Sequence, residues 1–344
     1  MTIPLLLLVL RGLDWPAQAL HDLTFDLPTP GLDALHADAL IRVEPAPDVA
    51  GSDVASAALW PRRHGAVAAS RRLGYGAHAD DGHWLCLDPV RLAFGDRSVR
   101  LHPLPESALA ADEGAALGVD LAAALAALGQ FELTTPARWH LRLAPHVSAP
   151  ILAAPMAGAD PSALLALDAA WRGALTDVQM LLHTHPVNAA RRATGAPEVN
   201  ALWPWGAGRL APAAAATPWR VFTDEPALRG HARHHGATVA PVPAHLNALP
   251  AGAPCLVVLD ALDGPAAAQD ATAWRHALAA FDADWFGPAH AALQSGAIGG
   301  IDIAITASDR LTRIAPRRAG PLRQTWRRLA RRPLPHAFER WSNP

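Results

Sequence analysis

The chain has 344 residues, of which 51% are hydrophobic and 17% are charged, and its formal net charge is -2. A chain of this length can bury a sizeable core, and it favours two domains or one large domain with an insertion. The small net charge excludes a long-range attraction of the whole molecule to nucleic acid or anionic lipid, and no stretch approaches the ~20 apolar residues that a membrane span needs.

The first half of the chain contains both strand and helix patterns. The apolar run at residues 3–10 predicts a buried strand, and residues 29–36 predict a turn that opens a short helix. The Ala- and Leu-rich residues 106–129 predict one or two helices that break near Gly118. Alternating polar and apolar residues at 138–143 are typical of a half-exposed strand.

The second half of the chain follows a Pro/Ala/Gly linker at residues 147–161 and alternates helices with strands. Helices are predicted at residues 161–184, 225–235 and 265–282, and strands at 218–223, 238–240, 255–260 and 301–306. This alternation predicts an α/β fold with a mostly parallel central sheet and helices on both of its faces.

The two cysteines lie in apolar runs. Cys86 and Cys255 are expected to be buried free thiols, which suits a reducing, cytoplasmic location. No Cys/His cluster indicates a structural zinc site.

Three short segments carry a family resemblance because they occur together and in order. They are PTPGLDAL at residues 28–35, GSDVA at residues 51–55, and HPVN with Arg191 and NALWPWGAG between residues 185 and 208. Together they resemble the archaeal-type, cofactor-independent phosphoglycerate mutases of the alkaline-phosphatase superfamily. Residues 81–90, taken with residues 202–206, also resemble a proteobacterial group labelled phosphoglycerate mutase-like or regulatory protein RpfE.

The resemblance implies a domain organisation. Residues 1–60 and 171–316 would form an alkaline-phosphatase-like α/β core, and residues 61–170 would form an inserted, smaller α+β region. Residues 317–344 are an arginine-rich C-terminal helix or tail.

The resemblance also implies a centre of two divalent metals (Mn, Zn or Mg) that activates a Ser or Thr nucleophile. The family's first metal ligand is an Asp just after strand one, where this chain has Arg11, and a guanidinium repels a cation. Asp260, Asp263 and Asp309 fall near the later ligand positions, but the histidines expected beside them are missing. We therefore expect no cofactor, with a residual weak metal site as the alternative.

Ser52 and Asp53 match the nucleophile segment. Ser52 is either a nucleophile at a helix start, where free N–H groups favour an anion, or a vestigial residue that merely caps the helix. Asn188, Arg191 and Asn200 could line an anion pocket for a small phosphorylated ligand, because a guanidinium fork suits phosphate. The alternative is that Asn188 caps a helix.

The arginine-rich end offers another hypothesis. Arg327, Arg328, Arg331 and Arg332 could contact an anionic partner such as nucleic acid or an acidic protein, or could be the solvated face of a docked helix.

The sequence thus leads to one main function and two alternatives. The main hypothesis is a catalytically degenerate phosphoglycerate-mutase-like protein, a pseudoenzyme with a regulatory or binding role. The alternatives are an active metal-dependent phosphotransferase or mutase that uses Ser52, and an anion- or nucleic-acid-binding module that uses the basic C-terminal helix.

Overall fold

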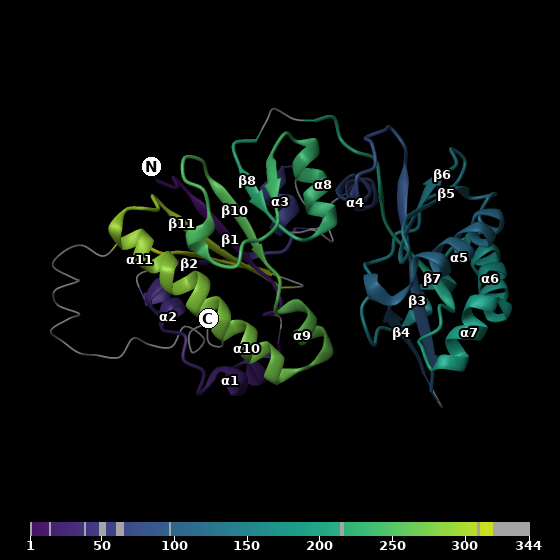
Figure 1. Cartoon of the computed structure of the whole chain (residues 1–344), viewed down its shortest axis with the longest axis horizontal. Helices are drawn as coiled ribbons and strands as arrows, with labels where there is room; N and C mark the ends of the chain where they lie inside the picture. The colour runs from purple at the N-terminus through teal and green to yellow at the C-terminus, as the bar shows by residue number, and fades with distance from the viewer. Residues whose placement is uncertain are drawn as a thin grey trace. The chain divides into compact units, whose positions relative to one another are not determined.

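The chain folds into two compact units (Figure 1). Unit 1 consists of residues 1–48, 215–224 and 235–344, and unit 2 consists of residues 49–214 and 225–234. The computed structural model describes residues 2–13, 15–37, 39–47, 53–59, 65–95, 98–213, 217–307 and 310–318.

Unit 1 is built around a seven-stranded sheet with the order β2-β12-β11-β1-β10-β8-β9. Its central strand β1 is buried at all five positions and pairs in parallel with β10 on one side and β11 on the other. The pairs β10–β8 and β8–β9 are also parallel, whereas β12 and β2 add an antiparallel edge that the sequence analysis did not predict. The strands are β1 Leu6–Leu10, β2 Leu40–Pro45, β8 Arg220–Phe222, β9 Thr238–Ala240, β10 Cys255–Leu259, β11 Ile301–Thr306 and β12 Arg310–Ala315.

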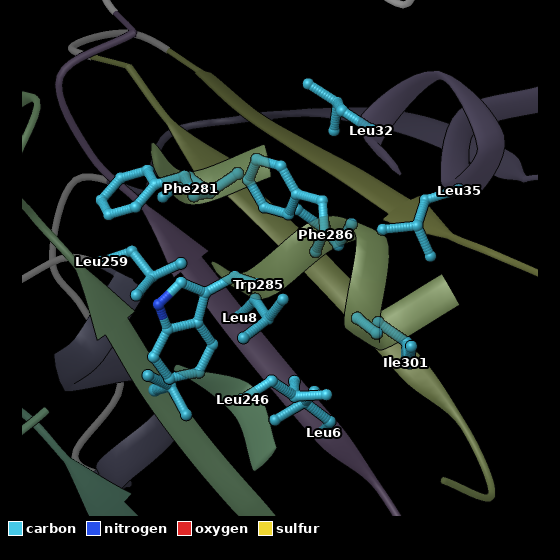
Figure 2. Packing of buried hydrophobic residues seen from close by; sticks show 14 of the residues in the cluster. Leu6, Leu8, Leu32, Leu35, Leu246, Leu259, Phe281, Trp285, Phe286 and Ile301 are labelled. Carbon is cyan, nitrogen blue, oxygen red and sulfur yellow. The ribbon is translucent and has the colours of Figure 1, made fainter. Parts of the chain in front are cut away.

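Helices pack their apolar faces against one face of this sheet (Figure 2). Alternate residues of β1, Leu6 and Leu8 among them, share a core with Phe281, Trp285 and Phe286. The helices of unit 1 are α1 Ala17–Thr24, α2 Pro30–Ala37, α9 Asp263–Ala268, α10 Ala271–Phe281 and α11 Gly287–Ser295, with the 3₁₀ turn η3 Leu246–Ala248 and the π-helical segment η4 Asp282–Phe286.

Unit 2 is built around an antiparallel sheet in which β3 pairs with β4, β6 and β7, and β5 pairs with β6. Its strands are β3 Trp84–Phe94, β4 Val99–Pro103, β5 Gly129–Thr135, β6 Arg138–Leu143 and β7 Ala201–Gly208. Its helices are α3 Val54–Leu59, α4 Val67–Gly74, α5 Ala111–Ala124, α6 Ala169–Thr184, α7 Pro186–Thr194 and α8 Pro226–His234, with the 3₁₀ turns η1 Glu106–Ala108 and η2 Pro161–Ala166.

The boundaries of the units differ from the predicted division. The insertion was expected over residues 61–170, but unit 2 extends to residue 214. The physical reason is that β7 pairs with β3, and α6 contributes Trp171, Leu175 and Val178 to the same apolar core as the unit 2 sheet. Residues 171–214 therefore fold with the second unit.

Three predicted helices have different limits. The helix α5 runs through Gly118 without the expected break. The predicted helix at residues 161–184 is divided in two, because the Asp168 carboxylate accepts a hydrogen bond from the Trp171 N–H and so caps the start of α6. The predicted helix at residues 265–282 is divided in the same way, because the Asp270 carboxylate accepts from the Ala273 N–H and caps the start of α10. An Asp that accepts such a bond starts a new helix rather than continuing the previous one. No helix in the described part of the chain is long and apolar enough to cross a membrane.

Two glycines let α4 and α8 of unit 2 approach each other closely. A Cβ at Gly74 would lie 1.9 Å from the carbonyl oxygen of Pro226, and a Cβ at Gly230 would lie 1.9 Å from that of Ser70. Backbone oxygens cannot move aside as a flexible side chain can, so both positions need glycine.

We expect Gly230→Ala to lower the free energy of unfolding of unit 2 by about 1–3 kcal/mol, because the added methyl overpacks the helix crossing. Gly173→Ala on α6 is the matched control, since its Cβ would meet nothing within 4 Å. That control should gain about 0.5–1 kcal/mol from helix propensity. Urea denaturation followed by tryptophan fluorescence measures both, and equal stabilities for the two variants would contradict the close crossing.

Candidate ligand-binding site

The carboxyl ends of the parallel strands of unit 1 meet at one edge of the sheet. Arg11 follows β1, Asp224 comes shortly after β8, and Asp260 follows β10. In open α/β sheets ligands bind outside this edge. A ligand-binding site is therefore expected at this edge of the unit 1 sheet.

A hollow of about 280 Å³ opens at this edge. Its lining includes three carboxylates, from Asp224, Asp260 and Asp284, and apolar surface from Leu259, Phe281 and Trp285. No arginine or histidine belongs to this lining within the described residues. The hollow thus pairs an acidic rim with an aromatic wall.

The turn after β1 is locked against the loop after β10. Gly12 has a φ of +80°, and a Cβ there would lie 2.4 Å from the backbone carbon of Leu262. The Arg11 N–H donates to the Leu259 carbonyl at 3.1 Å, and the Trp274 indole donates to the Gly12 carbonyl at 2.7 Å. The backbone of Arg11 is thereby held at the edge, at the end of the strand that pairs with the one leading to Asp260.

The described residues do not fit a two-metal centre. Asp260 and Asp263 lie on the loop after β10, but no group of three or more His, Cys, Asp or Glu side chains able to hold a metal ion is found in the part of the chain that the structure describes. Ser52 and Asp309, the other predicted participants, lie outside the described residues. We derive no chemical step through a metal.

Asp53 caps the short helix α3. Its carboxylate accepts hydrogen bonds from the Ser56 N–H at 3.0 Å and the Ser56 hydroxyl at 2.5 Å. Burial raises the pKa of Asp53, but the hydrogen bonds from Ser56 and from backbone N–H groups, that of Ala55 among them, together outweigh burial and hold the pKa below its ordinary value. Asp53 thus caps the start of α3, whereas Ser52, expected either as a nucleophile or as a cap, lies outside the described residues.

The three predicted anion-binding residues do not form a pocket, because each binds its own chain. Asn188 bonds to the Leu182 and Val199 carbonyls and to the Val199 N–H. Arg191 makes two contacts of 2.8 and 2.9 Å to Glu113. Asn200 bridges the N–H and carbonyl of Leu92. These contacts hold α7 and β7 in place. They give the motif between residues 185 and 208 a structural role.

The PTPGLDAL motif also has a structural explanation. The carboxylate of Asp282 accepts hydrogen bonds from the Gly31 and Leu32 N–H groups, at 3.0 and 2.8 Å, and so caps α2 from a distant part of the chain. A Cβ at Gly31 would lie 2.3 Å from the Gly287 nitrogen, so this contact requires glycine. Burial raises the pKa of Asp282 above its ordinary value.

A buried ionic network in unit 2 escaped the sequence analysis. The Arg71 guanidinium makes two bonds of 3.0 and 2.8 Å to Asp88, and the Trp205 indole donates to the same carboxylate at 2.7 Å. Burial lowers the pKa of Arg71, but the Asp88 carboxylate more than offsets this and keeps it charged. Its members come from α4, β3 and β7, so no local pattern marks them as partners.

The same network assigns the tautomer of His140. The Arg71 Nε–H donates to His140 Nε2 at 3.0 Å, so the ring proton of the neutral imidazole is on Nδ1, 2.6 Å from the Thr134 hydroxyl. That hydroxyl donates to Glu132, which pairs with Arg72 at 2.6 Å. These members are buried or partly buried and each is bound to another, so the network stabilises the unit.

No family model matches this chain, and no curated protein sequence matches it. Among solved structures, it is similar to the PH0037 protein from Pyrococcus horikoshii, with a TM-score of 0.52, 17% identity, and 92% of this chain and 88% of that chain covered. It is also similar to a cofactor-independent phosphoglycerate mutase from Thermoplasma acidophilum, with a TM-score of 0.45, 15% identity, and 92% and 90% of the two chains covered. The first similarity shows a shared fold.

We expect Asp88→Ala to lower the free energy of unfolding by about 3–5 kcal/mol, because it leaves the Arg71 guanidinium buried without its counter-charge. The matched control is Glu198→Ala, which breaks a half-exposed pair with Arg192 and should cost less than about 1 kcal/mol. Chemical denaturation of both variants measures these changes. Similar losses in the free energy of unfolding would show that the buried Arg71–Asp88 pair stabilises the unit no more than an exposed pair does.

The ring of His140 should stay neutral as the pH falls. Burial, and then the nearby charges of Arg71 and Arg72, lower its pKa well below 6.5. Below about pH 6.5 His140 binds a proton in the unfolded chain but stays neutral in the folded chain. The contribution of His140 to the free energy of unfolding is therefore lost as the pH falls. Nitrogen NMR of the imidazole, assigned with His140→Gln, should show the Nδ1–H tautomer unchanged at pH 5, whereas a titration midpoint near pH 6.5 would contradict the buried network.

Proposed function

We propose that this chain is a catalytically degenerate phosphoglycerate-mutase-like protein that binds a ligand at the carboxyl edge of its parallel sheet. The observation that carries the proposal is the position of Arg11. Its backbone is fixed directly after the central strand and beside the strand that leads to Asp260. An arginine at that position supplies a positive charge where the family has a carboxylate, and a positive charge opposes a divalent metal.

The sequence motifs support the phosphoglycerate-mutase-like scaffold, because all three occur in order. The regulatory part of the proposal, the likeness to the RpfE group and a cytoplasmic location rest on the sequence alone. The hollow supports a binding role, because it lies where α/β sheets bind ligands.

The alternative is an active phosphotransferase that uses Ser52 as its nucleophile. It is favoured by the survival of Asp260 and Asp263 after β10 and by Asp53 at the start of α3. The predicted partner site at Arg327, Arg328, Arg331 and Arg332 lies outside the described residues.

The test is the metal content and phosphoglycerate mutase turnover of the purified chain with Mn, Zn or Mg added. We expect no metal-dependent turnover above the level of Ser52→Ala. We also expect Arg11→Asp, which removes the opposing charge, to raise Mn affinity by at least about tenfold, measured by calorimetry. Metal-dependent turnover that Ser52→Ala abolishes would establish the alternative.

A further inference from the structure

The sheet of unit 1 ends in a short, exposed edge strand, β2. This strand pairs with β12 on one side, and in the described part of the chain no strand pairs with its other side. Five of its six residues are exposed, among them Leu40 at 41% and Val43 at 56%. Alternate residues of an edge strand direct their N–H and C=O groups outward, so β2 is a template for a further strand.

The charges on β2 are not balanced by its one neighbouring strand. Arg42 lies directly opposite Arg313 of β12, and like charges in this position destabilise a strand pair. Arg313 contacts Glu44 instead, with 3.6 Å between Nε and Oε2, and both side chains are partly exposed. Within the described residues Arg42 has no acidic partner. A carboxylate supplied from beyond the edge would therefore relieve the repulsion at Arg42.

A second copy of β2 supplies that carboxylate in one register. When two identical strands pair antiparallel, outward backbone groups must face each other, so the twofold axis passes through a residue and not between two. An axis at Arg42 or at Glu44 would bring like charges together. An axis at Val43 places Arg42 opposite the partner's Glu44 and, by symmetry, Glu44 opposite the partner's Arg42. The segment Arg42–Glu44 is thus complementary in charge to itself.

The side chains on both faces of β2 suit this register. Val43 lies on the same face as Ile41, whose cross-strand neighbour Ile314 belongs to the core of unit 1, so two Val43 side chains would extend that apolar face. The charged pairs would lie on the other face. Pro45 has no N–H and ends the strand, so the pairing is short and the dimer is weak.

We infer that β2 is the docking surface for a second copy of this chain, which pairs through its own β2, antiparallel and with Val43 at the twofold axis. The occupant is a second copy because the strand carries both the charge that needs a partner and the charge that answers it. The inference goes beyond the proposed function and does not depend on it.

The first test exchanges the charges and follows the full-length chain by sedimentation velocity up to about 300 µM. Glu44→Arg places arginines opposite each other at both symmetric positions and should weaken dimerisation at least about tenfold. The double variant Arg42→Glu, Glu44→Arg restores opposite charges in the same register and should recover the dimer. Asp177→Arg, at an exposed position on α6 of unit 2, makes the same change in net charge as Glu44→Arg and should have no effect.

The second test locates the twofold axis by oxidation with copper phenanthroline. Val43→Cys should form a disulfide between two copies, because opposed residues have Cβ atoms about 4.5–5.5 Å apart. Leu40→Cys is also exposed, but its two copies would lie about 20 Å apart and should stay unlinked. The natural cysteines, Cys86 and Cys255, are buried and should not react.

Three results would each overturn the inference. The first is a natural chain that stays monomeric, including one that dimerises only when residues 319–344 are removed, since its own end would then cover the edge. The second is a dimer that Glu44→Arg leaves intact or that the double variant fails to recover. The third is equal cross-linking of Val43→Cys and Leu40→Cys.

Discussion

The structure of unit 1 depends on the pairing of β1 at both of its edges. Five consecutive apolar residues are buried between β10 and β11, so every ladder hydrogen bond of this strand must come from segments more than 240 residues further along the chain. The backbone N–H and C=O groups of a strand buried on both faces cannot bind water, so they need strand partners. The sheet of unit 1 can therefore form only when β10 and β11 pair with β1, and such long-range contacts form slowly. Most of the intervening stretch, residues 49–214, forms the second unit together with residues 225–234.

Unit 2 is organised by a different interaction, a bidentate ion pair between Arg71 and Asp88 inside its apolar surroundings. Desolvation of two charges is costly, and the arrangement holds because further donors and acceptors from Trp205, Trp139 and His140 bind them. The network continues to Thr134, Glu132 and Arg72, whose guanidinium also lies 3.3 Å from the centre of the Trp84 ring. Polar residues therefore specify how helix α4 meets the sheet.

The candidate site at the edge of unit 1 depends on two close backbone contacts. Asp282 and Gly31 dock α2 onto η4, and that docking fixes the segment that carries Asp284 and Trp285. Gly12 fits the turn after β1 tightly against the loop after β10, so the Arg11 backbone cannot withdraw from the edge. These contacts hold an arginine and an acidic hollow at the same edge of the sheet, and this combination is the basis of the proposed function.

The sequence by itself determined the strands β1, β10 and β11, the parallel β8–β9 pair and the burial of Cys86 and Cys255, because apolar runs and turn residues act locally. Tertiary structure alone decided the roles of Asn188, Arg191 and Asn200, whose partners include Glu113 and Leu92, 78 and 108 residues away. It also decided that residues 171–214 join unit 2 and that Asp168 and Asp270 begin new helices. The reason is physical: whether a polar side chain meets a ligand or its own backbone depends on which distant segments fold beside it, and no local pattern records that.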